Sequence, residues 1–187
     1  LRATDFQQQA KKLLLSKMNG VDVWGFKDPR VTKLLPFWKG IFSELGADVH
    51  YVFALRHPMS IADSLAERDE FFVEKSNLLT LEYWLAALVG TVNEKVTFVE
   101  YENLLLHPKQ ELQKVADLTG LTIDKLDLEV FSKEFLDTKL QHSKYDLSEV
   151  RVDSNSHPIL GEMYETLVEI ARGKIDVGSR QVRTKLN

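Results

Sequence analysis

Residues 49–69 read VHYVFALRHPMSIADSLAERD, and this stretch joins a β-prone segment to a helical one. Residues 49–55 are nearly all apolar or aromatic, which is typical of a parallel strand that helices cover on both faces. Arg56 follows the strand, and Pro58 suits the first turn of a helix that we expect to continue to about residue 68. The stretch therefore predicts a buried strand, a short turn that carries Arg56, and a helix.

Two other parts of the chain repeat this order of strand, loop and helix. Residues 21–26 are a short β-prone run before a helical pattern over 31–45, and residues 96–101 precede a helical pattern over 108–119. Further helical patterns cover residues 4–18, 76–92, 124–131 and 158 to about 172. Strands that alternate with helices predict an α/β fold with three layers, in which a parallel sheet carries helices on both faces.

The composition is that of one ordinary globular domain. The 187 residues are 44% hydrophobic and 28% charged, which is enough for one continuous core, so we expect a single domain over 1–187 with a flexible tail from about 176. A net charge of -4 gives no global attraction to nucleic acid, so any anion site must be local. There are no cysteines, the histidines match no metal-binding spacing, and no apolar run reaches the roughly 20 residues of a membrane span. We therefore expect no metal, no nucleic acid partner and no membrane span.

Three polar features follow the predicted strands: Lys27-Asp28-Pro29-Arg30, Arg56 with Ser64, and Tyr101-Glu102-Asn103. In open parallel sheets, ligands bind beyond the carboxyl ends of the strands, close to the beginnings of helices. These features should therefore lie at one edge of the sheet.

Arg56 and Ser64 form a candidate site for a phosphate monoester. Ser64 lies about two turns into the helix after Arg56, so a guanidinium fork and a hydroxyl could converge on one phosphate. The alternative is that Arg56 pairs with Asp63 or Glu67 at the rim of the sheet, and that Ser64 has no function.

Three blocks of the sequence resemble sulfotransferases that use 3′-phosphoadenosine 5′-phosphosulfate. Residues 51–69 resemble the strand and helix that hold the cofactor's 3′-phosphate, where an Arg is followed shortly by Pro and eight positions later by Ser. Residues 98–121, FVEYENLLLHPKQELQKVADLTGL, are similar to a later block of the family, and residues 23–38, VWGFKDPRVTKLLPFW, resemble the Lys-Asp-Pro loop of bacterial and protein-tyrosine members. The blocks occur in the family's order and cover about half of the chain.

The resemblance implies a sulfotransferase domain of the P-loop nucleoside-triphosphate-hydrolase-like type. Its reaction would transfer a sulfuryl group from 3′-phosphoadenosine 5′-phosphosulfate to a hydroxyl or amine of a small-molecule or carbohydrate acceptor, in the cytoplasm where the cofactor is supplied. Arg56 and Ser64 would bind the 3′-phosphate, and Tyr101 would lie near the adenine or ribose. Lys27 would be a catalytic residue that stabilises charge near the sulfuryl group. The alternatives are a solvated Lys27 and a Tyr101 that only packs in the core.

The sequence also departs from the family's pattern. The family's first strand and its loop resembling Pro-Lys-Ser-Gly-Thr-Thr, which cradles the 5′-phosphosulfate, have no counterpart here, so we expect a partial domain with an exposed sheet edge. Pro29 stands where many members have a catalytic His, and Asp28 is more plausible as a partner of Arg30 than as a base. The Arg-Lys-Gly loop of the family is absent as well, and Lys139, His142 and Lys144 are weak candidates for its substitute.

These departures leave the function open in three ways. The partial domain could be an enzyme that is inactive in this form and forms homo-oligomers through its exposed sheet edge. It could instead be a non-catalytic interaction or nucleotide-binding domain. A part of a nucleotide kinase, which would depend on Mg²⁺, is a third possibility.

Overall fold

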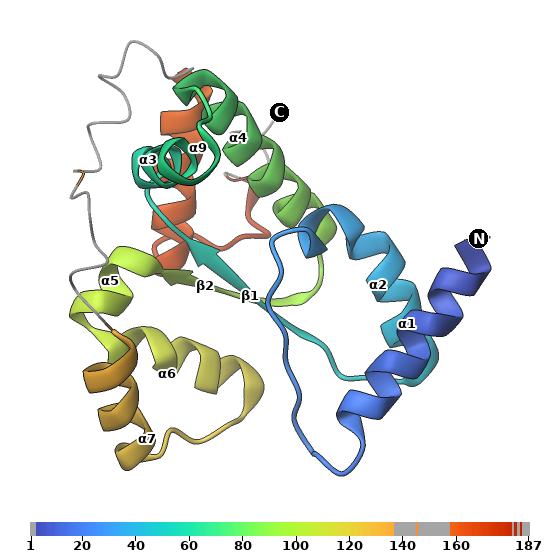
Figure 1. The fold of residues 1–187 in the computed structure, drawn as a ribbon. Coiled ribbons are helices and arrows are strands. Elements are labelled where there is room, and N and C mark those ends of the chain that lie inside the picture. Colours follow the sequence, from blue (N-terminus) through green and yellow to red (C-terminus); the bar gives the residue numbers. More distant parts are fainter. Residues whose placement is uncertain (1–2, 137–144, 146–157, 181, 183, 185–187) are drawn as a thin grey trace.

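The computed structural model describes residues 3–136, 145, 158–180, 182 and 184. Figure 1 shows the arrangement of the helices and strands. In chain order, they are α1 (Ala3–Met18), α2 (Val31–Leu45), β1 (His50–Leu55), α3 (Pro58–Asp69), α4 (Val73–Gly90), β2 (Lys95–Glu100), α5 (Tyr101–Leu106), α6 (Pro108–Thr119), α7 (Lys125–Val130), the π-helical turn η1 (Phe131–Phe135) and α9 (Pro158–Ala171).

The described part of the chain is mostly helical and has one small sheet, so the prediction of a three-layer fold with a parallel sheet between helices was wrong. β1 and β2 pair in parallel, with His50 opposite Lys95 and Leu55 opposite Glu100. α3 and α4 connect the two strands. The predicted order of strand, helices and strand is therefore correct over this central part, but the sheet does not extend into a layer.

Residues 21–26 were predicted to be a strand and are not one. A strand needs a partner for its backbone N–H and C=O groups, and β-prone residues cannot supply that partner by themselves. This segment is held by its aromatic side chains instead: the ring of Trp24 stacks on Phe26 at 5.2 Å, and Phe26 lies 5.5 Å from Trp38 of α2. The segment therefore packs as an extended loop on a helix.

The hydrophobic core lies between the sheet and the helices α4 and α9. Its buried members are Leu55, Trp84, Leu88, Phe98, Leu160, Met163, Tyr164, Leu167, Val168 and Ala171. α9 is the more deeply buried of the two helices. Most of its apolar positions are buried, and so are Gly161 and Thr166. Packing of α9 and α4 against the strands fixes the carboxyl ends of β1 and β2, where the candidate site lies.

The longer helices agree closely with the predictions. The predicted bounds of the helices at 31–45 and 108–119 are those of α2 and α6, and the helix predicted after Pro58 is α3. α5 and η1 were not predicted. In the described ranges, no helix is long and apolar enough to cross a membrane.

Candidate functional site

Arg56 and Tyr101 are brought together by the pairing of the two strands. Leu55 and Glu100, the last residues of β1 and β2, lie opposite each other in the parallel register, so the residues that follow them leave the sheet side by side. The guanidinium carbon of Arg56 lies 5.2 Å from the centre of the Tyr101 ring, within the range of a cation–π contact. The ring therefore supports the guanidinium at the edge of the sheet.

Ser64 reaches the same place from α3. Its hydroxyl oxygen accepts a hydrogen bond from Nη1 of Arg56 at 3.1 Å, and both side chains are half-buried. α3 begins directly after the turn because Pro58 occupies its first position and the Nδ1 atom of His57 accepts a hydrogen bond from the Met59 N–H at 3.3 Å. The three residues that the sequence nominated for the nucleotide, Arg56, Ser64 and Tyr101, thus form one cluster.

The alternative partner of Arg56 at the rim of the sheet is not observed. Among the described residues, Arg56 forms no ion pair with Asp63 or Glu67. Asp63 accepts a hydrogen bond of 2.7 Å from the Tyr145 hydroxyl, and the Tyr145 ring stacks on His57 at 5.3 Å. Tyr145 therefore covers the beginning of α3, and no carboxylate in the described part of the chain is bound to the Nη groups of Arg56.

Glu102 is also part of the site, although the sequence analysis assigned it no role. Its Oε1 atom accepts a hydrogen bond from the His57 N–H at 3.0 Å, which ties the beginning of α5 to the turn after β1. Its Oε2 atom and Nε of Arg56 are both buried, and neither has a hydrogen-bond partner in the described part of the chain. Burial raises the pKa of the Glu102 carboxyl above its ordinary value, and the nearby Glu100 carboxylate adds to this effect.

Two buried carboxylates, Glu100 and Glu111, connect the elements that support the site. Glu100 pairs with Arg172 of the C-terminal region through hydrogen bonds of 2.7 and 3.0 Å. Glu111 of α6 is fully buried and accepts hydrogen bonds from the Glu100 N–H at 2.9 Å, the Asn103 amide at 2.5 Å and the Lys114 ammonium at 2.6 Å. These bonds join β2, α5, α6 and the end of α9, and so they fix the position at which Tyr101 and Glu102 leave the sheet.

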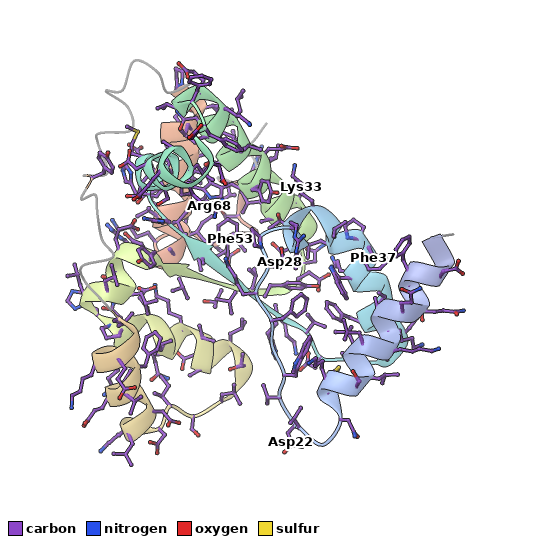
Figure 2. All side chains as sticks on the ribbon, viewed as in Figure 1. Asp22, Asp28, Lys33, Phe37, Phe53 and Arg68 are labelled. Atoms are coloured by element: carbon purple, nitrogen blue, oxygen red, sulfur yellow. The ribbon has the colours of Figure 1, made fainter. Side chains whose placement is uncertain are left out.

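Lys27 is not part of this cluster. Its side chain is exposed, and the described residues provide it with no hydrogen bond or ion pair. Asp28 pairs with Arg30 through bonds of 2.6 to 3.2 Å, which lower the pKa of the Asp28 carboxyl to about 2. This confirms the expected structural role of Asp28, because so acidic a carboxylate is a weak base. Figure 2 shows Asp28 and Lys33 at the beginning of α2, where Lys33 pairs with Glu82 of α4.

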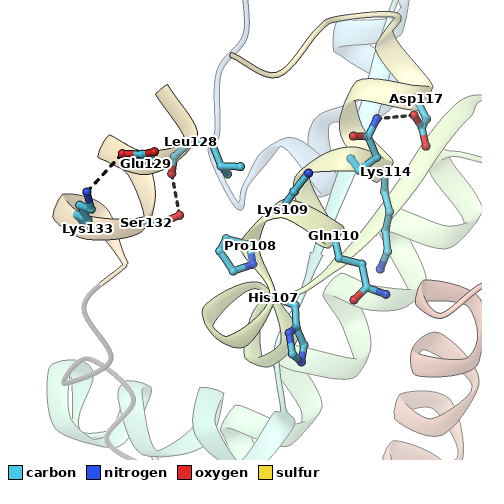
Figure 3. A pocket seen from close by; sticks show the side chains of 11 residues that line it. His107, Pro108, Lys109, Gln110, Lys114, Asp117, Leu128, Glu129, Ser132 and Lys133 are labelled. Atoms are coloured by element: carbon cyan, nitrogen blue, oxygen red, sulfur yellow. Dashed lines mark hydrogen bonds and ion pairs between the residues drawn. The ribbon is translucent and has the colours of Figure 1, made fainter. Parts of the chain in front are cut away.

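Two cavities lie away from the cluster. One of about 800 Å³ lies between α6 and the helical segment of α7 and η1, and Figure 3 shows its lining, which includes His107, Lys109, Leu128 and Lys133. The other, of about 480 Å³, is lined by β2 and the residues after α9. Neither is lined by the predicted nucleotide-binding residues Arg56, Ser64 and Tyr101. Lys139, His142 and Lys144 lie outside the described residues.

The cluster has the chemistry of an anion site. It offers a guanidinium and a hydroxyl, which together suit a phosphate oxygen better than a neutral ligand. The described residues form no group of three metal-binding side chains. The guanidinium and the hydroxyl of the cluster can bind an anion. The sequence signal for Glu102 is its position directly after Tyr101.

Comparisons with known proteins identify no relative. No protein-family model, no curated protein and no solved structure matches the chain.

Proposed function

We propose that this chain binds the phosphate monoester of a 3′-phosphorylated adenosine nucleotide through Arg56 and Ser64. The observation that carries the proposal is the 3.1 Å contact between Nη1 of Arg56 and the Ser64 hydroxyl, with the guanidinium stacked on Tyr101. A guanidinium held from one face retains N–H groups that can form a fork with phosphate oxygens, and Ser64 can donate a hydrogen bond to the same phosphate. The proposal rests on this local geometry and needs no extended sheet.

The resemblance of the sequence blocks extends the proposal to sulfuryl transfer from 3′-phosphoadenosine 5′-phosphosulfate. In this reaction the bond between sulfur and the bridging oxygen breaks, a bond forms between sulfur and the acceptor oxygen or nitrogen, and the acceptor loses a proton to a base. Arg56 and Ser64 would position the nucleotide, and Lys27 would place positive charge near the sulfuryl group. The acceptor would be a small molecule or a carbohydrate, and the cytoplasm is the compartment that we propose from the supply of the cofactor.

A second function is nucleotide binding without transfer, and the exposed side chain of Lys27 favours it. Catalytic stabilisation requires a cation that is held close to the reacting group, and the described residues give Lys27 no hydrogen bond or ion pair that would hold it. Binding and transfer can be tested separately, because binding depends on Arg56 and transfer would depend on Lys27.

Calorimetric titration with adenosine 3′,5′-bisphosphate tests the binding proposal. We expect binding of the bisphosphate and binding at least tenfold weaker for adenosine 5′-monophosphate, since the second ligand lacks the 3′-phosphate. Arg56→Ala should remove the preference for the bisphosphate. Arg68→Ala is the matched control, because Arg68 is an exposed arginine of α3 that pairs with the neighbouring Asp69.

Equal affinity for the two nucleotides, or an Arg56→Ala variant that binds like the original chain, would contradict the binding proposal. Transfer is then tested by incubating the chain with 3′-phosphoadenosine 5′-phosphosulfate and mixed alcohol and sugar acceptors. If the original chain forms adenosine 3′,5′-bisphosphate from the cofactor and the Lys27→Ala variant does not, the chain is an enzyme. If the chain binds the nucleotide tightly but forms no bisphosphate from the cofactor, the second function is supported.

We also propose that the chain self-associates through the free edge of β1. Among the described residues, β1 pairs with β2 along one edge only. The sequence of β1, HYVFAL, contains no Pro or Lys, and Val52 in its middle is 48% exposed. Edges without such protection pair readily with other strands, and a second copy of β1 is a partner of equal length.

A further inference from the structure

Glu102 places a carboxylate beside the residue that would bind the phosphate. Its Oε1 atom is bound to the N–H of His57, the residue after Arg56, and Tyr101, the residue before Glu102, stacks on the Arg56 guanidinium. The carboxylate is thus held from both strands at the point where the phosphate would bind. It belongs to neither the core network of Glu111 nor the pair of Glu100 with Arg172.

The charged and titratable groups around Glu102 come from every element packed at this point. Among the described residues, Arg56 from the end of β1 is a nearby cation, and Glu100 from β2 is a second carboxylate, which is itself paired with Arg172. Tyr164 from α9 has a pKa raised by burial and by the two carboxylates. His57 contributes its backbone N–H to Oε1, whereas Oε2 has no hydrogen-bond partner in the described part of the chain. Burial disfavours the ionised form of Glu102 more strongly than its backbone hydrogen bonds and Arg56 favour it, so the pKa of the carboxyl is raised even before an anion binds.

We infer that Glu102 tunes the anion site, and that binding of a phosphate at Arg56 is coupled to the uptake of a proton by the Glu102 carboxyl. This inference rests on the binding function proposed above. A phosphate dianion close to an ionised carboxylate in a half-buried place is opposed by like-charge repulsion, and protonation of Glu102 removes that repulsion. Glu102 would then determine how strongly the site holds a dianion at a given pH.

The direction of the pH dependence follows from linkage. Burial already raises the pKa of Glu102 in the free chain, and a bound dianion raises it further, so protons are taken up at pH values between the free and bound pKa. At lower pH, Glu102 is protonated in both states and does not oppose binding. At higher pH, it is ionised in both states and weakens binding by a constant factor.

The test compares the original chain with Glu102→Gln, which keeps an oxygen for the His57 N–H and removes the charge. Adenosine 3′,5′-bisphosphate is titrated by calorimetry between pH 4.5 and 8 in two buffers of different ionisation enthalpy. We expect the Glu102→Gln variant to bind the bisphosphate about tenfold more tightly than the original chain at pH 8, and with the same affinity at pH 4.5. The variant should also take up fewer protons than the original chain when it binds the bisphosphate. The ligand's own phosphates titrate near pH 6 in both proteins and cancel from the comparison.

Glu129→Gln is the control, since Glu129 is an exposed carboxylate of α7 that pairs with Lys133; this variant should behave like the original chain. If Glu102→Gln does not fold, ¹³C NMR of the Glu102 carboxyl in the original chain replaces it, and the carboxyl must titrate at higher pH when the bisphosphate is bound. Equal affinities of original chain and variant at pH 8, or an unchanged carboxyl titration, would overturn the inference while leaving the binding function intact. A chain that binds no bisphosphate would overturn both.

Discussion

At the scale of single residues, we propose that three side chains recognise an anion and that a fourth opposes it. Arg56, Ser64 and Tyr101 come from the end of β1, from α3 and from the beginning of α5, and they meet because the parallel register places Arg56 beside Tyr101. Glu102 is the opposing group. A cation that is stacked, hydrogen-bonded and still carries free N–H groups is already arranged for an incoming phosphate.

The buried carboxyl of Glu102 should also make the fold depend on pH. Because burial raises its pKa in the folded state, the folded chain binds more protons than the unfolded chain, and stability from this group is lost as pH rises through the folded pKa. Glu102→Gln should therefore melt at a higher temperature than the original chain at pH 8, and at the same temperature near pH 4. Melting curves followed by circular dichroism measure this, and a variant that melts at a lower temperature at pH 8 would count against it.

At the scale of elements, buried polar groups and close helix contacts hold the site in place. Glu111 joins α6 to β2 and α5, although α6 forms no part of the anion site itself. The sheet is too small to fix its own strand ends, so this network and the packing of α9 determine where Tyr101 and Glu102 lie.

Removal of Glu111 should be severe. Glu111→Ala leaves the buried Glu100 N–H without its acceptor and removes one of the two acceptors of the half-buried Lys114 ammonium, which keeps the Ala171 carbonyl. A buried donor left without its acceptor typically costs about 1–3 kcal/mol. Urea unfolding measures the loss, with Asp117→Ala on the exposed side of the same helix as the control, where less than about 1 kcal/mol should be lost. Similar losses in the two variants would show that Glu111 does not connect these elements.

The crossing of α2 and α4 depends on a glycine. A Cβ atom at Gly90 would clash with Cδ1 of Leu35, a buried side chain of α2, and would lie 3.3 Å from its Cβ atom. Gly90→Ala should therefore destabilise the fold by about 1–3 kcal/mol. In a double-mutant cycle, Leu35→Ala should cost less in the Gly90→Ala background than alone, because the two side chains compete for one space. Additive losses would contradict this contact.

Sequence reasoning succeeded where local patterns decide the structure and failed where pairing decides it. α2, α3 and α6 could be predicted because apolar spacing, Pro58, Pro108 and terminal glycines act within one segment. Residues 21–26 have the composition of a strand, but whether a β-prone segment pairs depends on a neighbour elsewhere in the chain. The same limit applies to the site: the spacing of Arg56 and Ser64 could be recognised within one segment of the sequence, whereas the approach of Glu102 to His57 depends on the register of two strands.

At the scale of the whole molecule, the small sheet leaves apolar side chains exposed. Val52 of β1 and Leu78 and Val89 of α4 are 48%, 66% and 66% exposed. Such exposure favours association with another surface.

Self-association should be sensitive to a charge at the free edge of β1. Val52→Lys places a cation in the middle of that edge, and lysines at this position oppose strand pairing between chains. We expect the variant to be shifted toward monomer in sedimentation velocity at concentrations where the original chain associates. Val89→Lys on α4 is the control, because it adds the same charge to an exposed apolar position outside the sheet. An identical distribution of species in Val52→Lys and the original chain would refute association through β1.

The account depends most on the claim that Arg56 and Ser64 hold a nucleotide phosphate, and a crystal structure of the chain with adenosine 3′,5′-bisphosphate tests this directly. We expect the 3′-phosphate within hydrogen-bond distance of the Nη atoms of Arg56 and of the Ser64 hydroxyl, with Tyr101 still stacked on the guanidinium. A nucleotide bound elsewhere, such as the cavity lined by Lys109 and Lys133, with Arg56 paired to a carboxylate of its own chain, would contradict the claim.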